Sequence, residues 1–182
     1  MKAIQFGDLQ FAIREHHATT EHWDFRFEFE SRLLSFVSDI PPHLNPDQPI
    51  KLIRVKDHQL KYLLSERIIP AGMPGAGPTA VGDKGVYSFL GPMHRSVQVT
   101  YGRVRIHLKG GLLRGDFFLK RLGSYSKVWI WKKEWDDQVD LTFKFPHILT
   151  PEKIQKLGGK RRNVNDFLPL FKGYPLNPFP GG

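Results

Sequence analysis

The most constraining feature of the sequence is a nine-residue run in which apolar and ionisable side chains alternate. From His22 to Glu30 every second residue is aromatic, and the residues between them are ionisable. Successive side chains of a β-strand point to opposite faces, so this period of two predicts a strand with one apolar and one fully ionisable face. The apolar face requires a core. The ionisable face is either solvated, as in an ordinary half-buried strand, or part of a site.

Shorter segments with the same period predict further strands. They lie at 52–55, 97–108, 116–120 and 127–132. Proline and glycine near residues 41, 46, 91, 110 and 123 predict the turns between them, and five glycines predict a loop over residues 71–85. Many short strands without an interleaved helical pattern predict an all-β fold, either an antiparallel barrel or a sandwich.

One short helix is expected near the C-terminus. Thr150 is suited to cap it, Pro151 to occupy its first position and Gly158-Gly159 to end it. We therefore expect one domain over residues 1–159. Residues 160–182 are basic at first and then rich in proline and aromatic residues, which predicts either a strap over the barrel or a docking peptide for another protein.

Composition narrows the possible partners and cofactors. The chain has no cysteine, which excludes disulfides, thiolate metal sites and cysteine nucleophiles. It has neither a signal peptide pattern nor an apolar run long enough for a membrane span, so we expect a cytoplasmic protein without a membrane partner. The net charge is +9, yet residues 1–30 hold six acids and only three bases. An acidic region in a basic chain suits a bound cation beside a polyanion.

Three residues form the candidate metal set. His22 and Asp24 are two residues apart on the predicted strand, so their side chains share a face. The turn-like residues 17–20 can bring His16 back over them. Two imidazoles and one carboxylate suit Mn²⁺, Fe²⁺, Co²⁺ or Zn²⁺. His17 is expected to lie outside this set.

Two further residue positions suit phosphate chemistry. Arg26 shares the ionisable face with Asp24 and offers a fork of donors to a phosphate. His58 follows a predicted strand and is near Tyr62 in sequence. By itself it is an ordinary surface histidine, but beside a metal ion it can contact a phosphate oxygen or protonate a leaving alkoxide.

Several motifs together resemble a known family. Residues 16–28 read HHATTEHWDFRFE and resemble the H-D-A-x-x-x-H-Y-D-F-R-L-E signature of the 3'-phosphoesterase domain of bacterial DNA ligase D and its stand-alone relatives. Residues 55–62 are similar to the family's V-E-D-H-P-x-x-Y, and residues 69–77 to its I-P-x-G-x-Y-G-A-G. Residues 113–121 and 129–133 resemble two later strands of the family, in the same order.

The resemblance implies an antiparallel β-barrel whose polar interior binds Mn²⁺, with Co²⁺ and Zn²⁺ as alternatives. Its implied activity is that of a hydrolase in DNA repair, which removes a 3'-terminal ribonucleoside as a phosphodiesterase and then the 3'-phosphate as a phosphomonoesterase. The implied partners are 3' ends of nucleic acid, on a primer-template or a single strand, and a DNA ligase or other repair protein bound through the tail. Carried over by position, the metal ligands are His16, His22 and Asp24, the phosphate contacts are Arg26 and His58, and Tyr62 is a required polar partner.

Departures from the family pattern shape the expected activity. Ile40 and Ile50 stand where the family carries cations, so we expect a weaker 3'-phosphatase than phosphodiesterase. The chain begins fifteen residues before His16, so we expect a stand-alone member. The alternatives are a non-catalytic β-barrel module that binds nucleic acid and an enzyme acting on a small phosphorylated molecule. The intact set of His16, His22 and Asp24 favours catalysis over binding alone.

Overall fold

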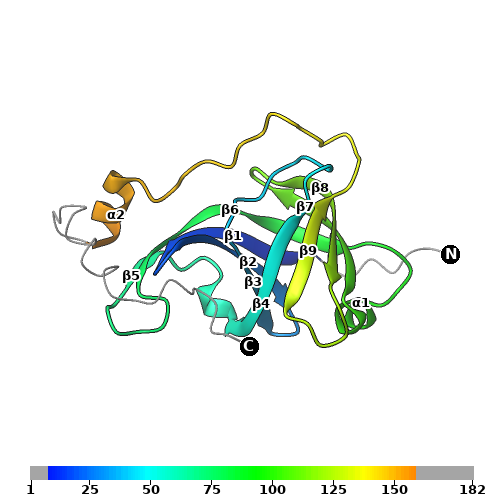
Figure 1. Ribbon diagram of the computed structural model, residues 1–182, viewed down its shortest axis with the longest axis horizontal. Helices are drawn as coiled ribbons and strands as arrows, with labels where there is room; N and C mark the ends of the chain where they lie inside the picture. The colour runs from blue at the N-terminus through cyan, green and yellow to red at the C-terminus, as the bar shows by residue number, and fades with distance from the viewer. Residues whose placement is uncertain (1–7, 159–182) are drawn as a thin grey trace.

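The structure, a computed structural model, describes residues 8–158, and its main elements are antiparallel strands (Figure 1). The elements in chain order are β1 (Leu9–His17), β2 (Glu21–Phe29), β3 (Arg32–Ser38), β4 (Ile50–Gln59), the 3₁₀ turn η1 (Leu60–Tyr62), β5 (Arg67–Ile69), β6 (Gly77–Phe89), α1 (Arg95–Tyr101), β7 (Arg103–Gly110), β8 (Arg114–Arg121), β9 (Val128–Lys133) and α2 (Pro151–Gly158).

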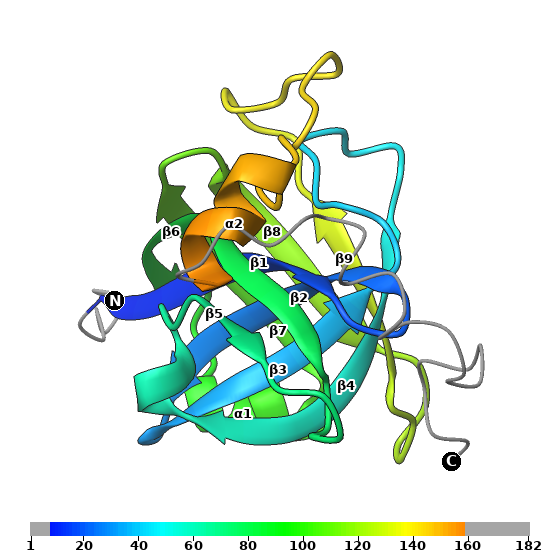
Figure 2. The same ribbon diagram turned by 90° about the vertical axis from the view of Figure 1, so that its left-hand side faces the viewer.

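Eight of these strands close into a barrel. Their order is β1-β2-β3-β4-β9-β8-β7-β6, and the antiparallel pairing of β6 with β1 joins the two ends of the sheet. The short strand β5 pairs only with the first residues of β6, and together with η1 it lies in front of β2 and β3 in Figure 2. The predicted all-β antiparallel barrel with a short helix near the C-terminus is confirmed.

Aromatic side chains fill the inside of the barrel. The ring of Phe25 on β2 is 5.3 Å from the indole of Trp131 on β9, which is not a neighbouring strand, and Phe117 on β8 stacks on the same indole at 4.5 Å. Because these side chains point inward, the ionisable residues between them on β2 point outward. The expected polar interior is therefore wrong. The interior is the apolar core, and the polar face is the outer surface of β1 and β2.

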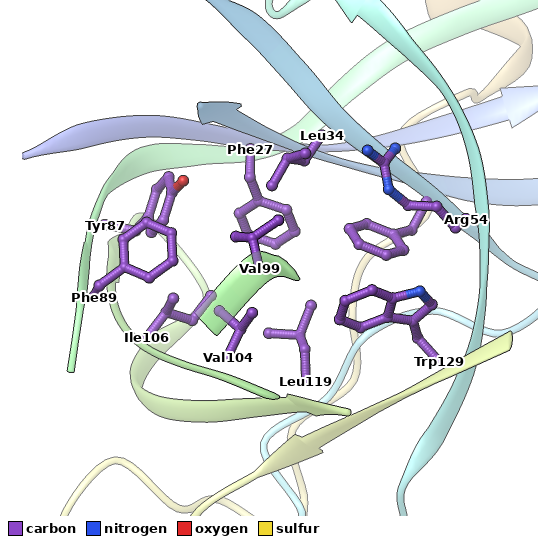
Figure 3. Close-up of a pocket in the computed structure, with 11 residues that line it drawn as sticks. Phe27, Leu34, Arg54, Tyr87, Phe89, Val99, Val104, Ile106, Leu119 and Trp129 are labelled. Atoms are coloured by element: carbon purple, nitrogen blue, oxygen red, sulfur yellow. The ribbon is translucent and has the colours of Figure 1, made fainter. Parts of the chain in front are cut away.

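A small apolar cavity lies in the core at the end of the barrel next to α1. Figure 3 shows side chains from several strands around it, with Val99 of α1 among them. Its volume is about 30 Å³. The guanidinium of Arg54 lies over the Phe36 ring and donates to the carbonyls of Ser35 and Val55. This cavity is part of the core packing and offers no reactive group.

The predicted loop over residues 71–85 is too long, because β6 begins at Gly77. A Cβ atom on Gly85 would lie 2.2 Å from the carbonyl oxygen of Lys109, and one on Gly77 would lie 1.9 Å from that of His17. These glycines permit the close approach of neighbouring backbones, not a turn. Glycine content alone does not distinguish the two uses.

The predicted strand over residues 97–108 is wrong in its first part, where α1 forms. His94 accepts a hydrogen bond from Ser96 N at the start of α1, and Gly102, with φ of 69°, ends it. Gln98 is buried and its amide donates to the carbonyls of Leu90 and Met93. The alternation of valine and polar residues here therefore does not mark a buried and an exposed face.

The predicted C-terminal helix is confirmed as α2. Lys153 N donates to Thr150 Oγ1 at 3.2 Å, as expected for the cap, and Ile154 packs against Ala80 and Leu149. The predicted domain end at residue 159 and the tail 160–182 lie outside the described residues. Within residues 8–158 no helix is long and apolar enough to span a membrane.

Substitution of Gly85 tests the close approach of β6 and β7. We expect Gly85→Ala to lower the free energy of unfolding by about 1–3 kcal/mol, because backbone atoms of Lys109 and Gly110 must move. Gly158→Ala is the matched control, since its Cβ would meet only the Ile68 side chain at 3.5 Å. Urea unfolding curves measure both variants. Equal curves would show that the strands do not approach this closely.

Candidate metal centre and cationic pocket

The three predicted metal ligands meet beside the turn of the β1–β2 hairpin. His16 pairs directly with His22 in the strand register, and Asp24 follows two residues later on β2. Asp24 Oδ2 is 3.7 Å from His16 Nδ1, and Asp24 Oδ1 is 3.4 Å from His22 Nε2. One ligand atom from each residue lies within 4.8 Å of the others. The sequence therefore selected residues that the fold brings together.

Backbone carbonyls orient both imidazoles of this set. His16 Nε2 is 2.7 Å from the carbonyl oxygen of Gly75, and His22 Nδ1 is 3.1 Å from that of Thr20. A carbonyl only accepts, so these nitrogens carry protons, and the other ring nitrogens, His16 Nδ1 and His22 Nε2, face Asp24. Histidine metal ligands are commonly held in this way, so the donor set fits a divalent ion.

Burial and mutual contacts set the protonation of these three side chains. Burial of the His16 imidazole lowers its pKa to about 4, so it is uncharged at neutral pH. Burial disfavours charge on His22 as well, but the hydrogen bond to Asp24 outweighs it and raises the His22 pKa. Burial would raise the pKa of Asp24, yet His22 and Arg26 hold it well below its usual range. Asp24 is thus a carboxylate with positive charge gathered around it.

Two buried arginines frame the same face of β1 and β2. Arg26 donates from one terminal nitrogen to Asp24 Oδ2 at 3.3 Å and from the other to the carbonyl of Tyr62 at 2.8 Å. Arg14 donates to the carbonyls of Tyr62 and Ser65 and to Thr79 Oγ1. Burial lowers the pKa of Arg14 to about 10, so it remains charged at neutral pH. The two guanidinium groups hold the chain after η1 against the barrel.

This arrangement leaves a pocket of about 220 Å³ between the hairpin and the segment of residues 62–79. Asp24 is the only acidic residue among those that line it, whereas three arginines do so. The excess of positive charge suits an anionic group such as a phosphate. The lining residues are Arg14, His16, Asp24, Arg26, His58, Tyr62, Ser65, Arg67, Ile69, Pro74 and Thr79.

His58 lies at the pocket with one nitrogen already engaged. The Ser35 hydroxyl donates to the carbonyl of Leu33 at 2.9 Å, so its oxygen accepts from His58 Nδ1, also at 2.9 Å. In the neutral ring this leaves Nε2 as a proton acceptor. Burial and then the charge of Arg26 lower the His58 pKa, so the neutral form prevails at neutral pH.

Tyr62 and Glu28 differ in their relation to the site. The Tyr62 carbonyl binds both buried arginines, and the guanidinium of Arg67 lies 5.2 Å from the centre of its ring. Its expected role as a polar partner stays a prediction. Glu28, on the same predicted face as Asp24, accepts from Gln10 N and does not line the pocket.

Sequence reasoning missed Arg14 and Arg67. Arg14 precedes His16 by two residues, so the period of two signals that it shares the face of the ligands. Arg67 has no such local signal, because the pairing of β5 with β6 brings it to the pocket. Ile50 is fully buried in the core and Ile40 lies outside the pocket lining, so neither position contributes to the site.

The fold and the site together define a β-barrel domain with a His/His/Asp set beside a cationic pocket. The family profile of the DNA ligase D 3'-phosphoesterase domain matches residues 14–121, which include every residue that lines this pocket. The match covers more than half of the chain, and the chain therefore belongs to this family.

Curated relatives agree with this assignment. The chain is 34% identical over 113 residues to the multifunctional non-homologous end joining DNA repair protein LigD of Mycobacterium tuberculosis, covering 61% of this chain and 14% of that protein. It is 31% identical over 125 residues to LigD of Pseudomonas aeruginosa, covering 69% and 15% respectively. It is 36% identical over 128 residues to LigD of Mycolicibacterium smegmatis, covering 66% and 16%. The chain thus spans about one-seventh of the length of these relatives.

Replacing Arg14 tests how the pocket is held together. We expect Arg14→Leu to lower the free energy of unfolding by about 2–4 kcal/mol, because several buried acceptors lose a charged donor. Arg67→Leu, a change of the same type at an exposed residue, should stay within about 0.5 kcal/mol. Urea unfolding distinguishes the two. Equal losses would contradict the buried role of Arg14.

Proposed function

We propose that this chain is a metal-dependent phosphoesterase that processes 3' ends of DNA or RNA–DNA in DNA repair. The observation that carries the proposal is the position of Asp24, which contacts His16, His22 and Arg26 at once. A phosphoryl group that approaches an ion in the His/His/Asp set is therefore within reach of a buried guanidinium. Membership of the 3'-phosphoesterase family supports the same reaction class.

Mn²⁺ is the proposed ion, with Co²⁺ and Zn²⁺ as alternatives, held by His16, His22 and Asp24. When bound, such an ion supplies Lewis acidity to a phosphoryl oxygen. Two imidazoles and one carboxylate suit all three metals, so the donor set favours a transition metal over Mg²⁺ or Ca²⁺.

The remaining residues would bind the phosphate and move protons. Arg26 would neutralise charge that develops on the phosphoryl oxygens. His58 Nε2 would accept a proton from the attacking water and then return it to the leaving oxygen. Arg67, exposed at the edge of the pocket, is suited to contact the next phosphate of the nucleic acid. Tyr62 acts in this scheme by holding Arg14 and Arg26 through its carbonyl oxygen.

The alternative is a β-barrel that binds nucleic acid without catalysis. The net charge of +9 favours it, because charge alone supports binding to a phosphate backbone. Backbone binding does not require two imidazoles oriented by carbonyls toward one carboxylate, and this geometry favours the enzyme.

Loss of a metal ligand tests the catalytic proposal. We expect Asp24→Asn and His22→Ala to reduce 3'-end cleavage more than about 100-fold, because both disrupt the ligand set. Glu28→Gln is the matched control, since Glu28 shares the strand and its face but does not line the pocket. The assay uses a labelled primer-template with one 3'-terminal ribonucleotide, with and without Mn²⁺. Cleavage at the parent rate by both ligand variants would contradict the proposal.

The balance of charge predicts a better phosphodiesterase than phosphomonoesterase. A 3'-phosphate monoester carries close to two negative charges and a diester one, so the monoester depends more on cations that are free to bind it. Arg14 and Arg26 both donate to protein acceptors, and Arg67 is the exposed arginine of the three. We expect a time course to show removal of the ribonucleoside and accumulation of the 3'-phosphate. A 3'-hydroxyl product that forms without this intermediate would show that these cations suffice for both reactions.

A further inference from the structure

A second cluster of ligand-type side chains lies on the other face of the same hairpin. Glu15 and His17 flank His16 on β1, and Glu21 opposes His17 at the start of β2. His147, from the segment between β9 and α2, completes the cluster. His147 lies outside residues 14–121, so the family match does not include the whole cluster.

Four contacts join these side chains into a ring. Glu15 Oε1 is 2.7 Å from His17 Nε2 and 3.3 Å from His147 Nδ1. Glu21 Oε1 is 3.4 Å from His17 Nε2 and 3.3 Å from His147 Nδ1. The ligand atoms of Glu15, Glu21 and His147 all lie within 4.8 Å of one another.

These distances can be compared with those around a metal ion. A tetrahedral ion with bonds of about 2.0–2.1 Å separates its ligand atoms by about 3.4 Å. The contacts of His147 with Glu15 and with Glu21 are already close to this value. His17 is not part of this ligand set, and its Nε2 lies at hydrogen-bond distance, 2.7 Å, from Glu15 Oε1.

The Glu15 carboxylate is held in the manner of a metal ligand. Its Oε2 accepts from the backbone N–H groups of Ile148 and Leu149, while Oε1 faces the two imidazoles. One oxygen is thus fixed by the backbone and the other is directed at the cluster. Outer hydrogen bonds of this type commonly orient ligating carboxylates.

Burial and access are also consistent with a bound cation. The Glu15 side chain is fully buried, and a second carboxylate nearby requires positive charge between them. The side chains of Glu21 and His147 are 44% and 71% exposed, which leaves a route from solvent. The buried indole of Trp23, 6.3 Å from the His147 ring, lies beside this route.

We propose that Glu15, Glu21 and His147 bind a second divalent transition-metal ion. Zn²⁺ suits this set, because it accepts imidazole and carboxylate ligands together. The ion would lie on the opposite face of the hairpin from the cationic pocket, so its proposed role is structural. It would fasten the segment around His147 to the hairpin that carries the candidate catalytic ligands.

Metal stoichiometry tests this site separately from the first one. The untagged full-length chain, freed of metal, is titrated with Co²⁺, which reports its coordination through visible absorption. We expect the parent chain to bind two equivalents of Co²⁺. We expect His147→Gln to bind one equivalent and to lose the intense absorption of four-coordinate cobalt. Glu21→Gln should behave in the same way. Asp24→Asn, at the other site, should retain that absorption.

Thermal unfolding with Zn²⁺ provides an independent readout. An ion that binds only the folded chain raises the Tm, so Zn²⁺ should stabilise Asp24→Asn but should stabilise the double variant Asp24→Asn, His147→Gln much less. The site is excluded if the parent chain binds one equivalent, or if His147→Gln leaves both stoichiometry and absorption unchanged. Circular dichroism of each variant checks that it is folded. None of these measurements depends on 3'-end cleavage, so the proposed function and this site can fail independently.

Discussion

The structure depends on the pleat of the β1–β2 hairpin, which directs neighbouring residues to opposite sides of one sheet. Phe25 and Phe27 point into the barrel and form its aromatic core, while Asp24 and Arg26 point to the outer surface. The same few residues therefore build the core and the candidate site. A register shift of one residue would exchange the two faces, so core packing and ligand position are specified together.

Charge on the outer face is balanced within a small volume. Asp24 lies between the imidazoles and Arg26, and the Tyr62 carbonyl lies between Arg26 and Arg14. A buried charge is stable only with partners that meet its hydrogen-bonding demand, and the chain after η1 supplies them as backbone carbonyls. Arg14 and Arg26 thus hold the segment that follows η1 over the pocket, and the same two residues contribute to the positive charge of the pocket.

The sequence predicted those features that are set by local geometry. His16, His22 and Asp24 were found because a tight hairpin and a spacing of two place them together. The fold class followed from the alternation of short segments, and α2 from its cap. The polar interior was expected only from family resemblance, and it conflicts with the rule that an aromatic strand face forms the core.

Other features depend on partners that are distant in the sequence. Arg67 reaches the pocket through the pairing of β5 with β6, and His147 reaches the hairpin from more than a hundred residues away. The glycines of β6 led to the prediction of a loop. Gly85 is required because the Lys109 backbone lies against it, and this contact exists only in the folded sheet. Such contacts leave no period or spacing to detect.

The central claim is that one divalent ion binds the outer face of the hairpin between His16, His22 and Asp24. Anomalous diffraction from a crystal soaked in Mn²⁺ tests it most directly. We predict a peak about 2.0–2.3 Å from His16 Nδ1, His22 Nε2 and an Asp24 carboxylate oxygen, with Arg26 facing it. Strong Mn²⁺ density elsewhere, with these three side chains directed away from one another, would contradict the account.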